Sequence, residues 1–329
     1  MLPTIIAWFN RTVMFGTVMM YGATGEIITE KSGHLNLGVP GIAYIGGFTG
    51  FATAFYYERS AAAFNPIVCI LLSFASAFIA SALMGLIYSF ITITLKANQN
   101  VTGLTITIFG VGVGNFFGKI VMGNKTVAVT PKGFAAYTTK IPFLSGTKII
   151  GDIFFKYGFM VYLAIIIALV VQYFLSKTRS GLNLRAVGED PAAADAAGIS
   201  VTKYKYLATC IGAGISGLGG LYYVLEYNKG MWATENGIEA LGWLAVALVI
   251  FATWKPVNII WGALLFGFLS WAYQYLPNIG ITIPNYAIEL VQTLPYIVTM
   301  IVLVFASFRN KKENQPPSSL GLSYFREER

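Results

Sequence analysis

SKTRSGLNLRAVGEDPAAADAAGISVTKY, residues Ser176–Tyr204, is the longest clearly polar segment between apolar runs of membrane length. It contains a short helix whose two ends are both marked. Asp190 can cap the first free N–H groups, Pro191 suits the first helical position, and Gly198 can end the helix in a left-handed turn. The residues between them are almost all alanine, a strong helix former. The stretch therefore predicts a helix over 191–197 that needs a further contact, because two isolated turns are marginal in water.

The charges around this helix indicate its side of a membrane. Basic residues are enriched in cytoplasmic loops, so the segment is expected on the cytoplasmic side. A helix covered by alanine is a narrow rod that fits a cleft in another protein. The alternative is an ordinary cytoplasmic loop with one helical turn. The basic residues in question are Lys177, Arg179, Arg185, Lys203 and Lys205.

The whole chain has the composition of a polytopic membrane protein. Of its 329 residues 56% are hydrophobic and 11% are charged, whereas soluble domains carry about 25% charged residues. Apolar runs of about 20 residues recur along it, and such runs cross a membrane as helices. We expect an all-α transmembrane bundle of eight to ten spans over 1–308, followed by a loose cytoplasmic tail over 309–329.

The apolar runs also give the expected limits of the spans. Five crossings before the polar segment would leave the N-terminus outside, and four crossings return the chain to a cytoplasmic tail. The expected spans are 5–28, 48–57 (the end of the second), 65–95, 101–122, 157–175, 204–225, 240–251, 257–276 and 286–308.

Residues Gly25–Phe48 are too rich in glycine and polar groups for a simple helix through hydrocarbon. Irregular backbone at membrane depth is tolerated only where protein or water covers it. This pattern favours a broken or re-entrant segment, and the alternative is a plain cytoplasmic turn between two spans.

Two expected spans carry small residues one helical turn apart, which lets a neighbouring helix approach closely. These residues are Gly110, Gly114 and Gly118 in one span, and Gly212, Ser216 and Gly220 in another.

Several classes of function are excluded by what the sequence lacks. The net charge of +8 lies in loops and tail, where it orients the chain and meets anionic lipid rather than nucleic acid. Cys69 and Cys210 lie in separate apolar runs and His34 is the single histidine, so we expect neither a disulfide nor a metal site. No nucleotide-binding fingerprint is present, so the chain is not expected to hydrolyse ATP.

The order of the motifs resembles that of ABC-importer permeases for branched-chain amino acids, simple sugars and nucleosides. RSGLNLRAVGEDPAAADAAGI, residues 179–199, is similar to the cytoplasmic coupling loop of that family. An early signature matches too, except that Pro40 stands where the family often has Glu. FATWKPVNIIWGALLFG, residues Phe251–Gly267, also resembles the family, with departures at Thr253, Lys255 and Val257. The early matches are Gly25, Glu26, Lys31, Ser32, Gly33, Asn36, Leu37, Gly38 and Gly41.

The resemblance implies a multi-pass permease subunit in a bacterial cytoplasmic membrane. Its partners would be a separate ATPase, which binds the ATP, a second permease subunit and an extracytoplasmic solute-binding protein. No cofactor is expected on this chain. The basic segment 123–156 is expected outside by alternation of the spans, where it would either dock an acidic binding protein or be only a solvated loop. The expected ATPase contacts are Arg185, Glu189, Asp190, Pro191, Asp195 and Gly198.

The solute is less closely defined by the sequence. The tail sequence LGLSYFREER and the turn near 254 resemble the nucleoside branch, so a nucleoside is the first expectation, then a simple sugar or an aromatic vitamin. Polar or ionisable side chains inside spans are candidates for the solute path by default. These candidates are Glu26, Asn36, Asn115, Gln274, Glu289 and Gln292.

Two other classes of function were weighed. An ion-driven secondary transporter would need membrane-buried carboxylates and internal inverted symmetry. Only Glu26 and Glu289 are candidates for the carboxylates, and no repeat is evident. A membrane enzyme would need a cluster of His, Asp, Glu or Cys at one face, and the sequence shows none.

Overall fold

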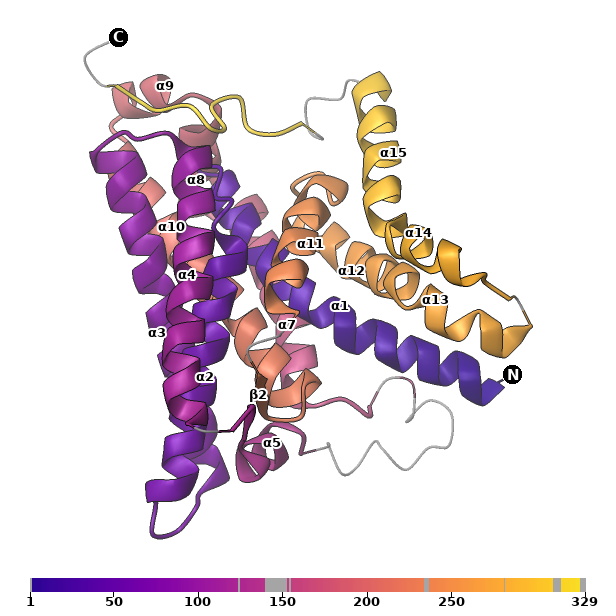
Figure 1. The fold of residues 1–329 in the computed structure, drawn as a ribbon. Coiled ribbons are helices and arrows are strands. Elements are labelled where there is room, and N and C mark those ends of the chain that lie inside the picture. The colour runs from indigo at the N-terminus through magenta and orange to yellow at the C-terminus, as the bar shows by residue number, and fades with distance from the viewer. Residues whose placement is uncertain are drawn as a thin grey trace.

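The computed structural model of the protein describes residues 2–123, 125–139, 153, 155–233, 237–280, 282–309 and 315–325. Within this part of the chain, long helices run between two opposite ends of the molecule (Figure 1). One face carries the short helices α8 and α9, and the opposite end of the left-hand helices carries a small sheet and α5. The expectation of an all-α membrane bundle is confirmed, apart from two strands of three residues each.

The first part of the chain forms four long helices. α3 continues without a break into a π-helical turn, η1 (Phe90–Thr94), so it keeps its direction through the expected third span. The four helices are α1 (Leu2–Glu30), α2 (Val39–Ser60), α3 (Pro66–Ser89) and α4 (Gln99–Met122).

A second set of elements contains the sheet and the polar segment Ser176–Tyr204. β1 and β2 pair antiparallel, with Val127 opposite Ala233. α10 ends in a π-helical turn, η2 (Tyr223–Tyr227). The elements are β1 (Val127–Val129), α5 (Pro131–Tyr137), α7 (Phe159–Lys177), α8 (Arg179–Glu189), α9 (Pro191–Ala196), α10 (Val201–Tyr222) and β2 (Met231–Ala233).

The last part of the chain is built from shorter helices. They are α11 (Ile238–Phe251), α12 (Pro256–Ser270), α13 (Ala272–Tyr275), η3 (Pro277–Ile279), η4 (Asn285–Ala287), α14 (Ile288–Gln292) and α15 (Leu294–Arg309).

Four helices are long and apolar enough to cross a membrane by length and composition. They are Pro66–Thr94, Gln99–Met122, Phe159–Lys177 and Val201–Tyr227, and each coincides with an expected span. Three shorter apolar helices lie in the last part of the chain. The total of eight to ten crossings stays a prediction.

The segment 25–48, expected to be broken or re-entrant, is broken rather than re-entrant, because α1 ends at Glu30 and α2 begins only at Val39. Residues 31–38 form a turn on the face that carries α8, and protein side chains satisfy its backbone donors. The N–H of Leu35 donates to Oε1 of Gln99 at 2.8 Å, and that of Asn36 donates to Oε1 of Glu26 at 3.0 Å. Buried side-chain acceptors therefore support a polar turn that needs no return into the membrane.

The expected span 286–308 is divided, because α14 ends at Gln292 and α15 starts at Leu294. Pro295 is the second residue of α15. Proline fits the first turn of a helix, but inside a continuous helix it removes a hydrogen bond and clashes with the preceding turn. The expected span 257–276 is likewise divided, since α12 ends at Ser270 and α13 follows.

The tail is not loose where the structure describes it. Residues 315–325 cross the top of the molecule in Figure 1, from the side of α15 to α9. The N–H of Ser319 donates to the carbonyl of Gly188 at 3.1 Å, and that of Gly321 donates to the carbonyl of Gly33 at 3.3 Å. The tail has no apolar face, and its composition therefore predicts a loose segment. The backbone hydrogen bonds that hold it do not require an apolar face.

α10 is the central helix, packed against α1, α2 and α3. Its expected small residues lie at these contacts. A Cβ on Gly212 would lie 2.5 Å from the carbonyl oxygen of Gly25 in α1, and a Cβ on Gly220 would overlap the carbonyl of Ala43 in α2. The hydroxyl of Ser216 donates to the carbonyl of Gly22 at 3.3 Å.

The three small residues of α4 face α2 and the sheet. A Cβ on Gly110 would overlap the carbonyl of Gly41, one on Gly114 would meet the ring of Tyr44, and one on Gly118 would meet the indole of Trp232. Backbone therefore contacts backbone where α2 and α4 cross, as small residues allow.

Gly110 and Gly112 give a matched pair of substitutions on the same helix. Gly110→Ala is expected to lower the stability of the detergent-solubilised protein by about 1–3 kcal/mol, because the methyl group must displace the backbone of Gly41. Gly112→Ala is expected to be neutral or stabilising, since nothing lies within 4 Å of its added Cβ. Thermal unfolding of the two variants checks this, and equal effects would contradict the crossing.

Candidate functional site

The short helix α9 has the capped ends that the sequence predicts, and it ends one residue earlier than expected. Oδ1 of Asp190 accepts the N–H groups of Ala192 and Ala193, each at 3.0 Å. At the other end the N–H of Gly198 donates to the carbonyl of Asp195, and the N–H of Ile199 donates to that of Ala194, both at 3.0 Å. These two bonds form a Schellman motif, and Gly198 has the positive φ of 80° that the motif requires.

α8 and α9 meet at one residue. Asp190 is both the last cap of α8 and the first cap of α9, with an extended backbone. A Cβ on Gly188, near the end of α8, would overlap the carbonyl of Lys31 in the turn after α1. Close packing against the 31–38 turn therefore fixes the position from which α9 starts.

α9 is amphipathic although it is mostly alanine. Ala194 is buried in a small cluster with Val187 and Val201. Ala193, Ala196 and Ala197 are exposed. The buried side anchors α9 to α8 and α10, and the exposed side presents methyl groups to solvent.

The tail completes this surface by binding both α8 and α9. The hydroxyl of Ser318 donates to Oε2 of Glu189 at 2.9 Å, and the hydroxyl of Ser319 donates to the carbonyl of Gly188 at 2.6 Å. The hydroxyl of Tyr324 donates to Oδ2 of Asp195 at 2.9 Å. We call α8, α9, the 31–38 turn and the 315–325 tail together the coupling surface.

The predicted ATPase contacts all lie on this surface, but they have unequal roles in the isolated chain. Asp190, Pro191 and Gly198 shape α9 itself, whereas Glu189 and Asp195 are hydrogen-bonded to the tail. Arg185 is partly buried, and its Nε has no hydrogen-bond partner among the described residues.

Lys31 is the basic residue at the centre of the coupling surface. Burial lowers its pKa from the ordinary value of a lysine, and the charge of Glu189 acts in the opposite direction. The coupling surface therefore contains charges of both signs, with Glu189 acting on Lys31.

The six polar residues proposed for a solute path fall into separate groups. Glu26 and Asn36 meet beneath the coupling surface. Oδ1 of Asn115, in α4, accepts the hydroxyl of Tyr44 at 2.5 Å. The other three lie on the adjacent helices α13 and α14 and are exposed in the single chain. They are Gln274, Glu289 and Gln292.

Glu26 is 1% exposed and holds the turn rather than facing a path in the single chain. We expect Glu26→Gln to leave uptake within about twofold, because the amide oxygen of Gln can still accept the N–H of Asn36. Glu26→Leu should cost about 1–3 kcal/mol, since that buried N–H loses its partner. Uptake and thermal unfolding of both variants check this. A large loss of uptake in a stable Glu26→Gln protein would contradict this prediction and would support a role of the carboxylate in the solute path.

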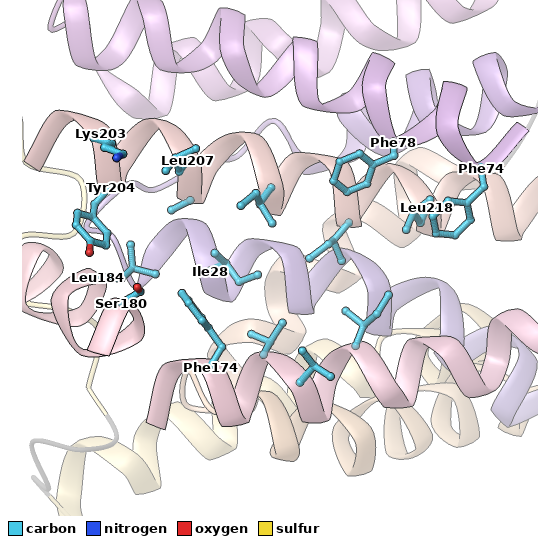
Figure 2. Close-up of a pocket in the computed structure, with 16 residues that line it drawn as sticks. Ile28, Phe74, Phe78, Phe174, Ser180, Leu184, Lys203, Tyr204, Leu207 and Leu218 are labelled. Atoms are coloured by element: carbon cyan, nitrogen blue, oxygen red, sulfur yellow. The ribbon is translucent and has the colours of Figure 1, made fainter. Parts of the chain in front are cut away.

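A cavity of about 750 Å³ opens between α1, α3, α7, α8 and α10. Figure 2 shows apolar side chains such as Ile28, Phe78 and Phe174 along it, with Lys203 and Tyr204 at the end near α8. None of the six polar candidates lines it. An apolar groove of this kind cannot pair the hydroxyl groups of a polar solute, so we do not assign the path to it.

The sequence did not predict the tail contacts or the burial of two further carboxylates. The tail contacts are made by a segment that has no apolar periodicity. Two further carboxylates are buried: Glu30 accepts the indole N–H of Trp254, and Oε1 of Glu226 accepts the N–H of Gly158 at 3.0 Å. The only signal for Glu30 was its spacing of four from Glu26. Of the basic external segment, Lys140 and Lys148 lie outside the described residues.

Comparison with known proteins places the chain in a family. The chain is 33% identical to the putative glucose ABC transporter permease protein TsgC13 of Haloferax volcanii, over 97% of each chain. It is 33% identical to the guanosine ABC transporter permease protein NupQ of Bacillus subtilis, over 89% of each chain. The nucleoside ABC transporter permease protein NupC of Lactococcus lactis is 28% identical, over 88% of this chain and 89% of that one. No solved structure matches the chain.

The family match covers almost all of the described helices. Residues 9–306 match the family described as branched-chain amino acid transport system, permease component. This range includes α8, α9 and the glycine crossings of α10, and it stops before the 315–325 tail. The chain therefore belongs to this family of ABC transporter permeases, and it is a multi-pass membrane protein of a transport family rather than an enzyme.

Proposed function

We propose that this chain is the membrane-spanning permease subunit of an ABC importer and that α9 transmits the movement of a separate ATPase to the spans. The observation that carries the proposal is α9 itself. It is capped at both ends, anchored through Ala194, and presents Ala193, Ala196 and Ala197 on the side of the molecule where basic loops place the cytoplasm. A short rigid rod at the membrane surface can pass on a push that a loose loop would absorb.

The coupling surface supports the choice of a macromolecular partner. The methyl groups of Ala193, Ala196 and Ala197 are exposed on a narrow helix, so a protein groove suits this side of α9 better than a small ligand. The partners would be the ATPase that binds ATP, an extracytoplasmic binding protein and a second permease subunit, in a bacterial cytoplasmic membrane. Exposure of Gln274, Glu289 and Gln292 supports a solute path completed by that second subunit.

For the solute we propose a nucleoside, with a simple sugar as the second choice. Two of the relatives are named for guanosine or nucleoside transport and one for glucose. All of these solutes carry a ring with several hydroxyl groups, which amide and carboxylate side chains such as Gln292 and Glu289 can bind. An aromatic vitamin is a third possibility that none of these names supports.

The alternative is a secondary transporter driven by an ion gradient. The structure favours this alternative more strongly than the sequence alone, because Glu26, Glu30 and Glu226 are all buried. Buried carboxylates are the groups that such transporters protonate. Each of the three, however, accepts a hydrogen bond from a backbone or indole N–H group, which gives it a structural role.

Gentle extraction of the chain from native membranes tests the proposal. Co-purification of an ATPase, with hydrolysis stimulated by a binding protein and uptake that follows ATP, is the expected result. Competition by nucleosides and sugars against the labelled solute then ranks the two solute classes. Recovery of the chain alone, with uptake that follows an ion gradient and ignores ATP, would establish the alternative.

A further inference from the structure

A second cavity lies directly under the tail, between α9, the start of α10 and the 31–38 turn. Its volume is about 230 Å³. Unlike the apolar groove, it is lined mainly by polar groups. They are His34, Thr92, Lys96, Asp195, Ser200, Thr202, Lys205, Ser323 and Tyr324.

Lys205 is the unusual group in this cavity. The sequence suggests an exposed loop charge, but the residue is 2% exposed. Among the described residues no hydrogen bond reaches its ammonium group, and Asp195 is the carboxylate that lines the same cavity. Lys205 lies one turn into α10 and lines the same cavity as Val201 and Thr202 of the first turn. A buried charge is costly unless it is paired, so this ammonium group favours a nearby anion.

His34 provides a second, independent observation. It is 2% exposed, and neither Nδ1 nor Nε2 has a hydrogen-bond partner among the described residues. Burial and the charge of Lys205 lower the pKa of His34 well below its ordinary value. The neutral ring therefore keeps one N–H donor beside the cavity with nothing to receive it.

The N-terminus of α10 adds further donors. Val201 and Thr202, its first two residues, line the cavity, and Ser200 makes no side-chain cap. The first N–H groups of a helix have no partner within the helix. Together with the helix dipole they favour an anion at this end.

We propose that this cavity binds one small oxyanion of the phosphate type, held by Lys205, His34 and the first turn of α10. The volume admits an ion of that size with some water, but not a whole nucleotide, since sites for drug-sized ligands begin at about 300 Å³. Asp195 also lines the cavity and opposes an anion. Its Oδ2 already accepts the hydroxyl of Tyr324, and Lys96 lies on the same cavity.

The position of the cavity gives the oxyanion a role. Ser323 and Tyr324 of the tail close it, and Lys96 lies 4.1 Å from the ring of Phe325. A bound anion attracts both lysines and thereby holds the tail against α9. This role rests on the proposed function of α9, whereas the binding itself does not.

Binding of labelled inorganic phosphate to the purified full-length chain tests the site. In phosphatidylcholine nanodiscs at constant ionic strength we expect saturable binding of one phosphate per chain. Lys205→Met should abolish it, and Lys203→Met, an exposed lysine two residues away, should leave it unchanged. Saturable binding that survives Lys205→Met, or is lost equally in Lys203→Met, would overturn the assignment.

The single histidine supplies a readout that does not depend on transport. With ¹⁵N-histidine labelling and a tag free of histidine, phosphate should shift the ring resonances of His34, and this shift should vanish in Lys205→Met. Should that variant fold poorly, Lys96→Gln serves as the second variant and should weaken the response.

Nanodiscs with phosphatidic acid distinguish the source of the phosphate group. Phosphatidic acid that is enriched around the wild-type chain but not around Lys205→Met, without binding of free phosphate, would support the site with a lipid headgroup as its ligand. Absence of both binding and enrichment, with unchanged His34 resonances, would refute the site. An uptake complex without an ATPase would refute the proposed function and leave these outcomes untouched.

Discussion

Replacing Asp190 by alanine together with Pro191 by glycine is expected to lower ATP-driven uptake by more than about tenfold, while the complex still inserts and hydrolyses ATP. The side chain of Asp190 accepts two of the free N–H groups of α9. Loss of such a cap costs about 1 kcal/mol, and glycine in place of proline adds up to about 1 kcal/mol of backbone freedom. A helix of six residues has no reserve against such a loss.

Uptake and ATP hydrolysis measured in the same proteoliposomes check this prediction. Asp190→Asn is the matched control, because asparagine caps as well as aspartate and removes only the charge. We expect this control to keep coupled uptake close to the wild-type level. Normal coupling in the double variant would show that a formed α9 is not required, and loss of coupling in Asp190→Asn would assign the role to the charge.

Deletion of residues 315–329 is expected to give the second large effect, a several-fold fall in uptake per ATP hydrolysed together with a lower melting temperature. The deletion removes the bonds from Ser318 to Glu189, from Ser319 to Gly188 and from Tyr324 to Asp195. At about 0.5–1.5 kcal/mol each, these bonds hold the tail on α8 and α9, and the bond from the N–H of Gly321 to the carbonyl of Gly33 ties the tail to the 31–38 turn. Without them α9 keeps its caps but loses part of its support.

A chain that ends after Phe325 is the control for the tail deletion, since it keeps every tail contact of the coupling surface that is described above. We expect it to behave like the full-length chain. Ser319→Ala narrows the effect to one buried hydroxyl and should produce a smaller loss in the same direction. If the full deletion keeps both the coupling ratio and the melting temperature, the tail contacts contribute nothing to function.

The sequence predicted the elements whose causes are local. The limits of α4, α7 and α10 follow from runs of apolar residues, and the caps of α9 follow from Asp190, Pro191 and Gly198. The small residues of α10 lie at crossings because no larger residue fits there. These outcomes depend on helix geometry and on the transfer of apolar side chains out of water. Residues close together in the sequence largely decide both.

The structure differs from these expectations at a turn that has a distant partner and at a span that contains a local proline. The glycine and polar residues after α1 favour a broken or re-entrant segment, because they do not suit a simple helix through hydrocarbon. The structure has a turn there, and Gln99, which is 64 residues from Leu35, accepts the N–H of Leu35. The division of the last expected span at Thr293 follows from Pro295, whose effect the apolar composition concealed.

By itself, then, the sequence determined that this is a helical membrane protein with a capped helix on its basic side, and it pointed to the permease family. Only the tertiary structure decided what surrounds that helix. It placed the tail against Glu189 and Asp195, and it buried Lys205 and His34 around one polar cavity. The physical reason is that polar groups pair one at a time and over long sequence separations, so they leave no periodic pattern, whereas apolar burial repeats with every helical turn.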